Sequence, residues 1–222
     1  MQVDVTRHIG AISRVVEDRL HGGRPARAVI ASRGYPTTID DLWEAITSAE
    51  RLPRWFLPIT GDLRLGGRYQ LQGNAGGTIT ACEPPRRFEV TWEHGGETTW
   101  LTVRLAEVSN GETRLELEHV AILEDLSKYG QFGPGAVGIG WDLTLMGLAE
   151  HLASGGAVDP AQGMAWMVSA PGKSFMRLSS DDWCRAAIAG GAEPEAARAA
   201  AARCTAAYTG EGDAAPAETT AG

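Results

Sequence analysis

Residues 135–154 read GAVGIGWDLTLMGLAEHLAS, and the rest of the chain is best understood as a wrap around this stretch. Its main apolar residues recur at steps of four, four, three and four, the period of one helical face: Val137, Trp141, Leu145, Leu148 and Leu152. Ile139 and Met146 widen this stripe beyond one side. Because Pro134 suits a first turn and Gly155 ends a helix, the sequence predicts a helix that lies deep against another layer.

Glycine is unusually frequent in this predicted helix, at Gly135, Gly138, Gly140 and Gly147. A glycine in a helix interior costs about 1 kcal/mol relative to alanine. We therefore expect something to approach the helix closely on that side. Tight packing of the helix on a sheet is the more common reason, and room for a ligand is the alternative.

The composition of the chain excludes several classes of protein. The 222 residues carry a net charge of −8, which argues against a general nucleic-acid binder because phosphate contacts need a basic surface. The sequence has no apolar run long enough to span a membrane. The N-terminus lacks the apolar core of a signal peptide, so we expect a cytoplasmic protein.

The residues that bind metals and cofactors form no recognisable pattern. Cys82, Cys184 and Cys204 are too few and too scattered for a disulfide framework or a zinc site, and the histidines show no ligand spacing. The glycine-rich segment 126–140 contains neither a GK[ST] nor a GxGxxG motif in a strand–turn–helix context, and its glycines suggest a mobile entrance loop instead. The sequence therefore predicts no metal and no cofactor.

The N-terminal residues show a helical pattern. Over 4–20, apolar side chains fall on one helical face, Asp4 suits the N-cap, and Gly22 ends the pattern. We expect residues 1–26 to form a helical extension packed on the rest of the chain. A homodimer contact is the alternative.

The middle of the chain has the order of an α+β fold. A strand is expected over 27–35, a helix capped by Thr37 or Thr38 and running through Ile46, and a short helical piece over 49–56. Strand-like runs then follow at short spacing: 59–63, 68–72, 78–82, 87–92, 98–107 and 112–120. Several alternate apolar and polar residues, which is typical of an antiparallel sheet with one buried face. Asn110–Gly111 predicts a hairpin between the last two strands.

The C-terminal part differs in composition. Asp181 and Asp182 look like the start of a short helix around 183–189, and Pro194 opens an alanine-rich helix to about Tyr208. We expect residues 156–209 to be a helical extension packed on the domain 27–155. The small, polar residues 210–222 predict a disordered tail.

Five motifs in this order resemble those of the SRPBCC superfamily, which has the START-like helix-grip fold. They are LWEAITSAERLPRWF (42–56), DLRLGGRYQL (62–71), GGTITACEPPRRFEVTW (76–92), TRLELEH (113–119) and GWDLTLMGLAEHL (140–152). Within the superfamily they are most similar to a bacterial branch named after the C-terminal domain of the heat-shock-protein-90 ATPase activator.

The resemblance implies a seven-stranded antiparallel sheet around the C-terminal helix, with a cavity between them. It also implies an apolar small molecule as the usual ligand, a cyclase or dehydratase activity in a minority of members, and co-chaperone activity in a few. The N-terminal helix and the residues after Gly156 depart from the common pattern. Fold does not imply function, so the resemblance leaves these functions open.

The candidate ligand-cavity residues are those that the sheet and helix patterns direct inward. They are Tyr69, Trp92, His119, Phe132, Trp141 and Leu145. His119 alternates with apolar residues of its strand, and a structural hydrogen-bonded histidine is the most common reason for that. The alternative is a histidine that anchors a ligand or acts as an acid or base.

Two classes of function remain open. One is the binding of an apolar or aromatic small molecule, and the other is a cyclase- or dehydratase-type enzyme that uses His119 and Tyr69. A co-chaperone role rests on the resemblance alone. Only two polar groups are expected inside the cavity, which favours a binding protein over an enzyme.

Overall fold

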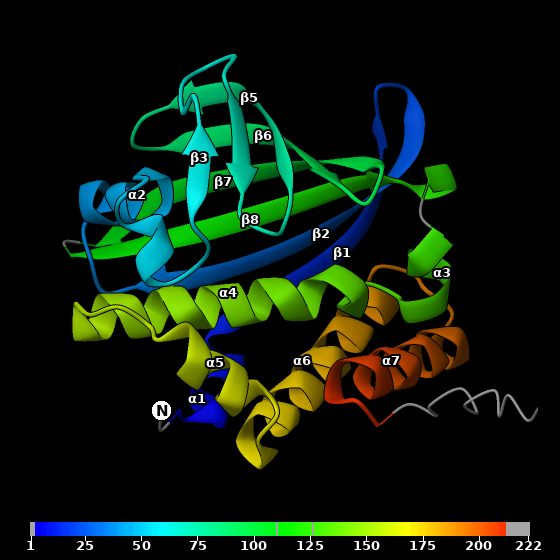
Figure 1. The fold of residues 1–222 in the computed structure, drawn as a ribbon. Helices are drawn as coiled ribbons and strands as arrows, with labels where there is room; N and C mark the ends of the chain where they lie inside the picture. Colours follow the sequence, from blue (N-terminus) through cyan, green and yellow to red (C-terminus); the bar gives the residue numbers. More distant parts are fainter. Residues whose placement is uncertain (1–2, 110, 126, 212–222) are drawn as a thin grey trace, which may run out of the picture.

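One curved antiparallel sheet lies along one face of helix α4 (Gly135–Ser154) in the computed structural model (Figure 1). The structure describes residues 3–109, 111–125 and 127–211. In these ranges the sheet has eight strands in the order β1-β2-β8-β7-β6-β5-β4-β3. The strands are β1 (Ile12–His21), β2 (Arg24–Tyr35), β3 (Ile59–Gly61), β4 (Arg68–Leu71), β5 (Gly76–Glu83), β6 (Arg87–His94), β7 (Glu97–Ser109) and β8 (Glu112–Ile122). The α+β helix-grip fold expected from the sequence is therefore confirmed.

Helices form the remaining layers. They are α1 (Val5–Gly10), α2 (Ile39–Thr47), η1 (Leu52–Arg54), η2 (Leu123–Asp125), α3 (Ser127–Phe132), α5 (Pro160–Met167), α6 (Ala170–Ala189) and α7 (Pro194–Thr209), besides α4. Helix α4 lies between the sheet and the C-terminal helices, while α2 lies at the left-hand end of the sheet in this view (Figure 1). The α4 bounds match the expected 135–154 because Gly155 adopts the left-handed conformation that ends the helix.

The expected N-terminal helix over 4–20 is wrong. Only Val5–Gly10 is helical, and Ile12–His21 is an edge strand that pairs with β2. Ile12 and Val16 point into the core, with Arg14 between them on the same face. A buried arginine at an inward strand position interrupts the apolar alternation, so spacing alone favoured a helix.

The added strand explains why the sheet has one strand more than the seven implied by the resemblance. Residues 1–26 therefore do not form a helical extension, because β1 belongs to the main sheet. At the other hairpin, Ser109 pairs with Glu112, as expected for a tight turn, although Asn110 lies outside the described residues. Of the predicted disordered tail 210–222, residues 212–222 also lie outside them.

The core sits between the concave sheet face and α4. On β7 and β8, Leu101, Val103 and Leu105 pair with His119, Leu117 and Leu115, and all six are buried. The five apolar ones share one cluster with Trp141, Leu145 and Leu148 of α4. The inward-facing residues of the strands and one face of α4 therefore pack together into one core.

Two of the four glycines of α4, Gly135 and Gly138, are explained by packing between helices. A Cβ at Gly138 would lie 2.4 Å from the Trp183 ring of α6, and one at Gly135 would lie 3.0 Å from Cys204 Sγ of α7. The glycines thus allow α6 and α7 to approach α4 on the side away from the sheet. Of the two expected reasons, close packing is the one observed here, although the partner is a helix pair instead of the sheet.

A buried polar cluster joins β1, α4 and α6. Arg14 Nε donates to Asp142 Oδ2 at 2.9 Å, and Ser179 Oγ and Trp183 Nε1 donate to the same oxygen at 2.5 and 3.2 Å. Arg14 Nη1 also donates to Asp182 Oδ2 at 2.7 Å. Asp182 lies inside α6, so the expectation that Asp181–Asp182 starts a helix is wrong. This cluster ties the C-terminal helices to the sheet.

Candidate functional site

A cavity of about 350 Å³ lies between the sheet, α4 and the α2–η1 segment, and we call it the sheet cavity. Strands β3 to β8 provide one wall, α4 a second, and α2 with the residues around η1 a third. The lining is Trp43, Ile46, Thr47, Leu52, Trp55, Phe56, Ile59, Leu63, Tyr69, Leu71, Ile79, Cys82, Pro84, Phe88, Val90, Trp92, Leu101, Val103, Leu115, Leu117, Trp141, Thr144, Leu145 and Leu148. A mostly apolar concave site of this size is typical of small-molecule pockets.

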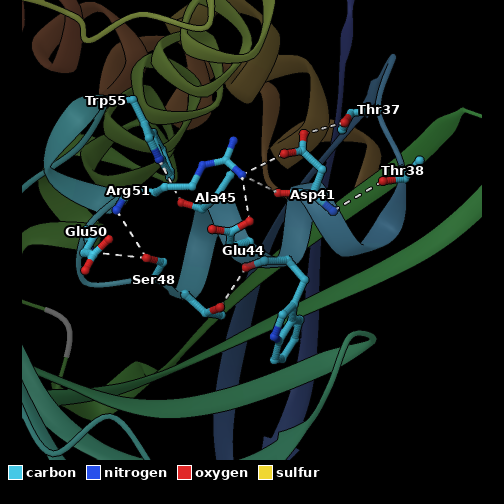
Figure 2. A network of polar contacts seen from close by, with 11 residues as sticks. Thr37, Thr38, Asp41, Glu44, Ala45, Ser48, Glu50, Arg51 and Trp55 are labelled. Atoms are coloured by element: carbon cyan, nitrogen blue, oxygen red, sulfur yellow. Dashed lines mark hydrogen bonds and ion pairs between the residues drawn. The ribbon is translucent and has the colours of Figure 1, made fainter.

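A network of polar contacts holds the α2–η1 wall together (Figure 2). Arg51 Nη1 donates to Asp41 Oδ1 at 2.7 Å, and Trp55 Nε1 donates to the Ala45 carbonyl at 2.9 Å. Burial alone would raise the pKa of Asp41, but hydrogen bonds from Thr37 and Arg51 hold it below its usual value. The network fixes the Trp55 ring against α2, where it forms part of the cavity wall.

The opening of the cavity is marked by the exposed members of its lining. Leu63 is 37% exposed, and Cys82 and Pro84 are also exposed. These residues lie before β4 and at the end of β5. The mobile entrance loop expected over 126–140 is wrong for its described residues, because α3 and the start of α4 occupy them and Phe132 packs against the cluster that contains Ile139 and Cys204.

The hydroxyl groups in the cavity wall are bonded to the protein itself. Tyr69 Oη donates to the Thr91 carbonyl at 2.8 Å, and burial raises the pKa of Tyr69. Thr47 Oγ1 donates to the Trp43 carbonyl, and Thr144 Oγ1 donates to the Gly140 carbonyl. The hydroxyls that line the cavity therefore leave an apolar surface with little capacity for chemistry.

His119 lies behind two tryptophans of the wall and makes a directed hydrogen-bond chain. Trp141 Nε1 donates to His119 Nδ1 at 3.0 Å, so Nε2 carries the imidazole hydrogen and donates to Thr99 Oγ1 at 2.7 Å. The Thr99 hydroxyl then donates to the Trp92 carbonyl. Burial lowers the pKa of His119 to about 4, so the ring is neutral at physiological pH.

The structure brings four of the six candidate residues together around the cavity. Tyr69, Trp92, Trp141 and Leu145 line it. His119 contacts the Trp92 and Trp141 rings edge-on but does not form part of the lining, and Phe132 lies on the far side of α4. The position expected for Phe132 in the cavity wall is therefore wrong.

Sequence reasoning missed the α2–η1 wall. Trp43, Trp55 and Phe56 all line the cavity but are not among the six candidates. The signal for them in the sequence is three large aromatic residues within the short segment 43–56. Leu115 and Leu117, whose inward position follows from the alternation of their strand, also line the cavity.

Comparisons with known proteins identify the family. The model of the family described as "Activator of Hsp90 ATPase homolog 1-like protein" matches residues 36–153, more than half of the 222 residues. The chain belongs to this family. The resemblance noted in the sequence is therefore confirmed, and the Activator of Hsp90 ATPase homolog 1-like match covers α2, strands β3 to β8 and nearly all of α4.

Solved structures extend the comparison beyond the family match. The crystal structure of CalU16 from Micromonospora echinospora is 31% identical, with 80% of this chain and 99% of CalU16 covered and a TM-score of 0.61. Its solution structure is 32% identical, with 82% and 97% covered and a TM-score of 0.66. A comparison with curated proteins gave no match.

A more distant structure supports the fold alone. EF2215 from Enterococcus faecalis, a conserved protein of unknown function, is 15% identical with a TM-score of 0.56, and 85% of this chain and 96% of EF2215 are covered.

The SRPBCC superfamily, to which the Activator of Hsp90 ATPase homolog 1-like family is related, includes ligand-binding and polyketide cyclase-like proteins. Among the residues that the structure describes, no helix is long and apolar enough to cross a membrane, and no group of side chains has the composition of a metal site.

Proposed function

We propose that this protein binds an apolar or aromatic small molecule in the sheet cavity. One observation carries the proposal: a space of about 350 Å³ opens between sheet and helix, and its walls are almost wholly apolar and aromatic. Burying apolar surface of a ligand in such a space is favourable by roughly 25 cal/mol per Å². Trp43, Trp55, Trp92 and Trp141 offer flat faces on several sides, which suits a planar ligand.

The size of the cavity limits the ligand. At a share of about 30 Å³ for each water-sized group, the cavity holds about a dozen non-hydrogen atoms. Two fused aromatic rings are of this size. Leu63, Cys82 and Pro84 at the opening form the path of entry.

The hydrogen bonding of the site favours binding over catalysis. An enzyme needs an acid or base with a free proton or lone pair that faces the substrate. His119 uses both ring nitrogens within the protein, and the Tyr69 hydroxyl donates to a carbonyl. We therefore prefer a binding protein to a cyclase- or dehydratase-type enzyme. The same two hydrogen bonds leave His119 no free ring nitrogen to hold the polar end of a ligand.

The test is a calorimetric titration of 2-naphthol, a probe of suitable size. Val90 lies on the cavity wall, so Val90→Phe would fill the space, and we expect binding to weaken by more than about tenfold, or ~1.4 kcal/mol. Val108→Phe is the matched control because Val108 is 60% exposed on β7. Equal binding by both variants, or no binding by the wild type and no co-purifying ligand in native mass spectrometry, contradicts the proposal.

A further inference from the structure

A second hollow lies beside the sheet cavity, and its walls come from α4, α5 and the residues after η1. This α5 hollow has a volume of about 420 Å³. At a share of about 30 Å³ for each water-sized group, it holds about 14 non-hydrogen atoms. Met164 on α5 is 61% exposed, so the hollow opens to solvent along this helix.

The walls of the α5 hollow are rich in methionine. Three of the five methionines of the chain, Met146, Met164 and Met167, line it together with Leu143 and Val158. Methionine is unbranched and flexible, so a wall of this kind adapts to irregular apolar ligands. The part of the sheet cavity that the structure describes contains no methionine in its lining. The methionine methyl groups therefore report on the α5 hollow and not on the sheet cavity.

Glu150 is the one charged side chain in the described lining of the hollow. Its side chain is 32% exposed, and Oε1 accepts a hydrogen bond from His8 Nε2 at 3.1 Å. Arg33 Nη1 donates to His8 Nδ1 at 3.2 Å, which leaves the imidazole hydrogen on Nε2. The imidazole ring therefore lies between the Arg33 guanidinium and the Glu150 carboxylate.

The bond from His8 positions Glu150 without neutralising its charge. Burial, followed by the charge of Arg33, lowers the pKa of His8, so the imidazole is neutral at physiological pH. Within the described ranges, no arginine or lysine lies within ion-pair distance of the Glu150 carboxylate. A carboxylate accepts about four hydrogen bonds, so Glu150 keeps most of its capacity to accept bonds from a ligand.

The rest of the wall offers no cationic donor to a ligand. Trp166 is 6% exposed and its indole nitrogen is buried, so this residue presents carbon to the hollow. The Thr144 hydroxyl donates to the Gly140 carbonyl inside α4. A negatively charged ligand would therefore meet the Glu150 carboxylate with no positive group in the wall to offset the repulsion.

A cation with an apolar tail matches this combination of groups. An ammonium group offers three N–H donors and a charge opposite to that of Glu150, which makes each hydrogen bond to the carboxylate stronger. The tail would bury apolar surface against the methionines, which is favourable by roughly 25 cal/mol per Å². The net charge of −8 also attracts cations to the protein as a whole.

We propose that the α5 hollow binds an organic ammonium ion with an apolar tail. The ammonium group pairs with the Glu150 carboxylate, and the tail lies among Met146, Met164 and Met167. This site is distinct from the sheet cavity, and it does not depend on the function proposed there.

The experiment is a nuclear magnetic resonance titration of n-octylammonium into protein that is isotope-labelled in its methionine methyl groups. We expect the signals of Met146, Met164 and Met167 to shift together and to fit one dissociation constant. Met176 is the internal reference, because it is 3% exposed and packs in another cluster with Ile139. Its signal should stay in place.

Glu150→Gln is the decisive variant. Glutamine has nearly the same size, and its side-chain oxygen still accepts from His8, so we expect the fold to be kept. It should bind n-octylammonium about fivefold or more weakly than the wild type, whereas the neutral n-octanol should bind equally to both. Glu107→Gln is the matched control, since Glu107 is exposed on β7 and the net charge changes by the same amount.

The outcomes separate this site from the sheet cavity. Equal affinity of Glu150→Gln and the wild type for n-octylammonium overturns the proposal, as does an equal loss in Glu107→Gln. The absence of a saturable shift at the three methionines overturns it as well. Val90→Phe alters the sheet cavity, so it should bind n-octylammonium like the wild type. A loss of binding in that variant would place the ammonium ion in the sheet cavity instead and contradict the proposal.

Discussion

The indole N–H of Trp141 on α4 donates to Nδ1 of His119 on β8 at 3.0 Å, and both side chains are buried. This bond joins the central helix to the middle of the sheet directly beside the sheet cavity. Trp141→Phe should keep most of the packing but leave Nδ1 without a donor, at a cost of about 1–3 kcal/mol. Trp141→Ala should cost about 3–5 kcal/mol because it also leaves a cavity. Urea unfolding measures both, and no loss in Trp141→Phe would mean that the hydrogen bond contributes nothing.

The buried neutral state of His119 makes the stability of the fold depend on pH. Its pKa is about 4 in the folded state, below the ordinary value of 6.5, so the unfolded state binds the proton first as the pH falls. The stabilisation that neutral His119 provides is complete above the pKa of the unfolded state, about 6.5. It is lost as the pH falls from there to about 4, by ~3 kcal/mol in all.

The variant that checks this is His119→Asn, whose side-chain oxygen can still accept from Trp141. It cannot titrate, so its unfolding free energy should fall less than that of the wild type between about pH 8 and about pH 4. The lowered pKa of His8 acts in the same direction in both proteins and cancels in the comparison. Identical pH profiles for the two proteins would show that His119 is not the group responsible.

The Arg14–Asp142 pair is expected to hold the C-terminal helices on the domain. Their side chains are 4% and 0% exposed, and removing one partner of a buried pair typically costs about 3–5 kcal/mol. Asp142→Ala should therefore lower the stability by that amount and increase hydrogen exchange in α6. The control is Glu211→Ala, which breaks a surface pair with Arg177 and should cost less than about 1 kcal/mol. Unchanged protection of α6 in Asp142→Ala would contradict this role.

Two glycines of α4 should respond to alanine in opposite directions. At Gly138 the new Cβ would lie 2.4 Å from the Trp183 ring, so we expect a loss of about 1–3 kcal/mol from overpacking. At Gly140 the nearest atom is Tyr208 Oη at 3.7 Å, so the better helix propensity should stabilise the protein by up to about 1 kcal/mol. Thermal unfolding of the two variants checks the pair. A loss at both positions would mean that Gly140 is needed for another reason.

The helix α4 was predictable because its signals are local. The apolar period, Pro134 and Gly155 all act within the segment, and the structure has the same bounds. The strands β6 to β8 were also predictable, since each alternates apolar and polar residues along its sequence. Strong local patterns of this kind need no knowledge of distant partners.

The strand β1 was not predictable because its pattern depends on distant residues. Arg14 occupies an inward position only because Asp142 and Asp182 pair with it, while Val15 and Leu20 are 48% and 70% exposed. A charged residue facing inward and apolar residues facing outward remove the alternation that would indicate a strand.

The candidate site was predicted only in part, because some of its residues depend on distant partners as β1 does. Tyr69, Trp92 and Trp141 follow from the faces of their own strands and helix. The role of His119 depends on its contacts with Trp141 and Thr99, and the place of Phe132 depends on α7. Neither the hydrogen-bond partners nor the packing of a C-terminal helix is encoded in the local spacing.

The most direct test of the account is to locate a bound ligand by intermolecular nuclear Overhauser effects. We would add decanol to the methyl-labelled protein and record contacts between its protons and the methyl groups. The account predicts contacts to Val103, Leu117 and Leu145, which line the interior of the sheet cavity. Contacts confined to exposed methyl groups such as those of Leu20 would contradict it. The absence of any contact up to the solubility limit of decanol would contradict it as well.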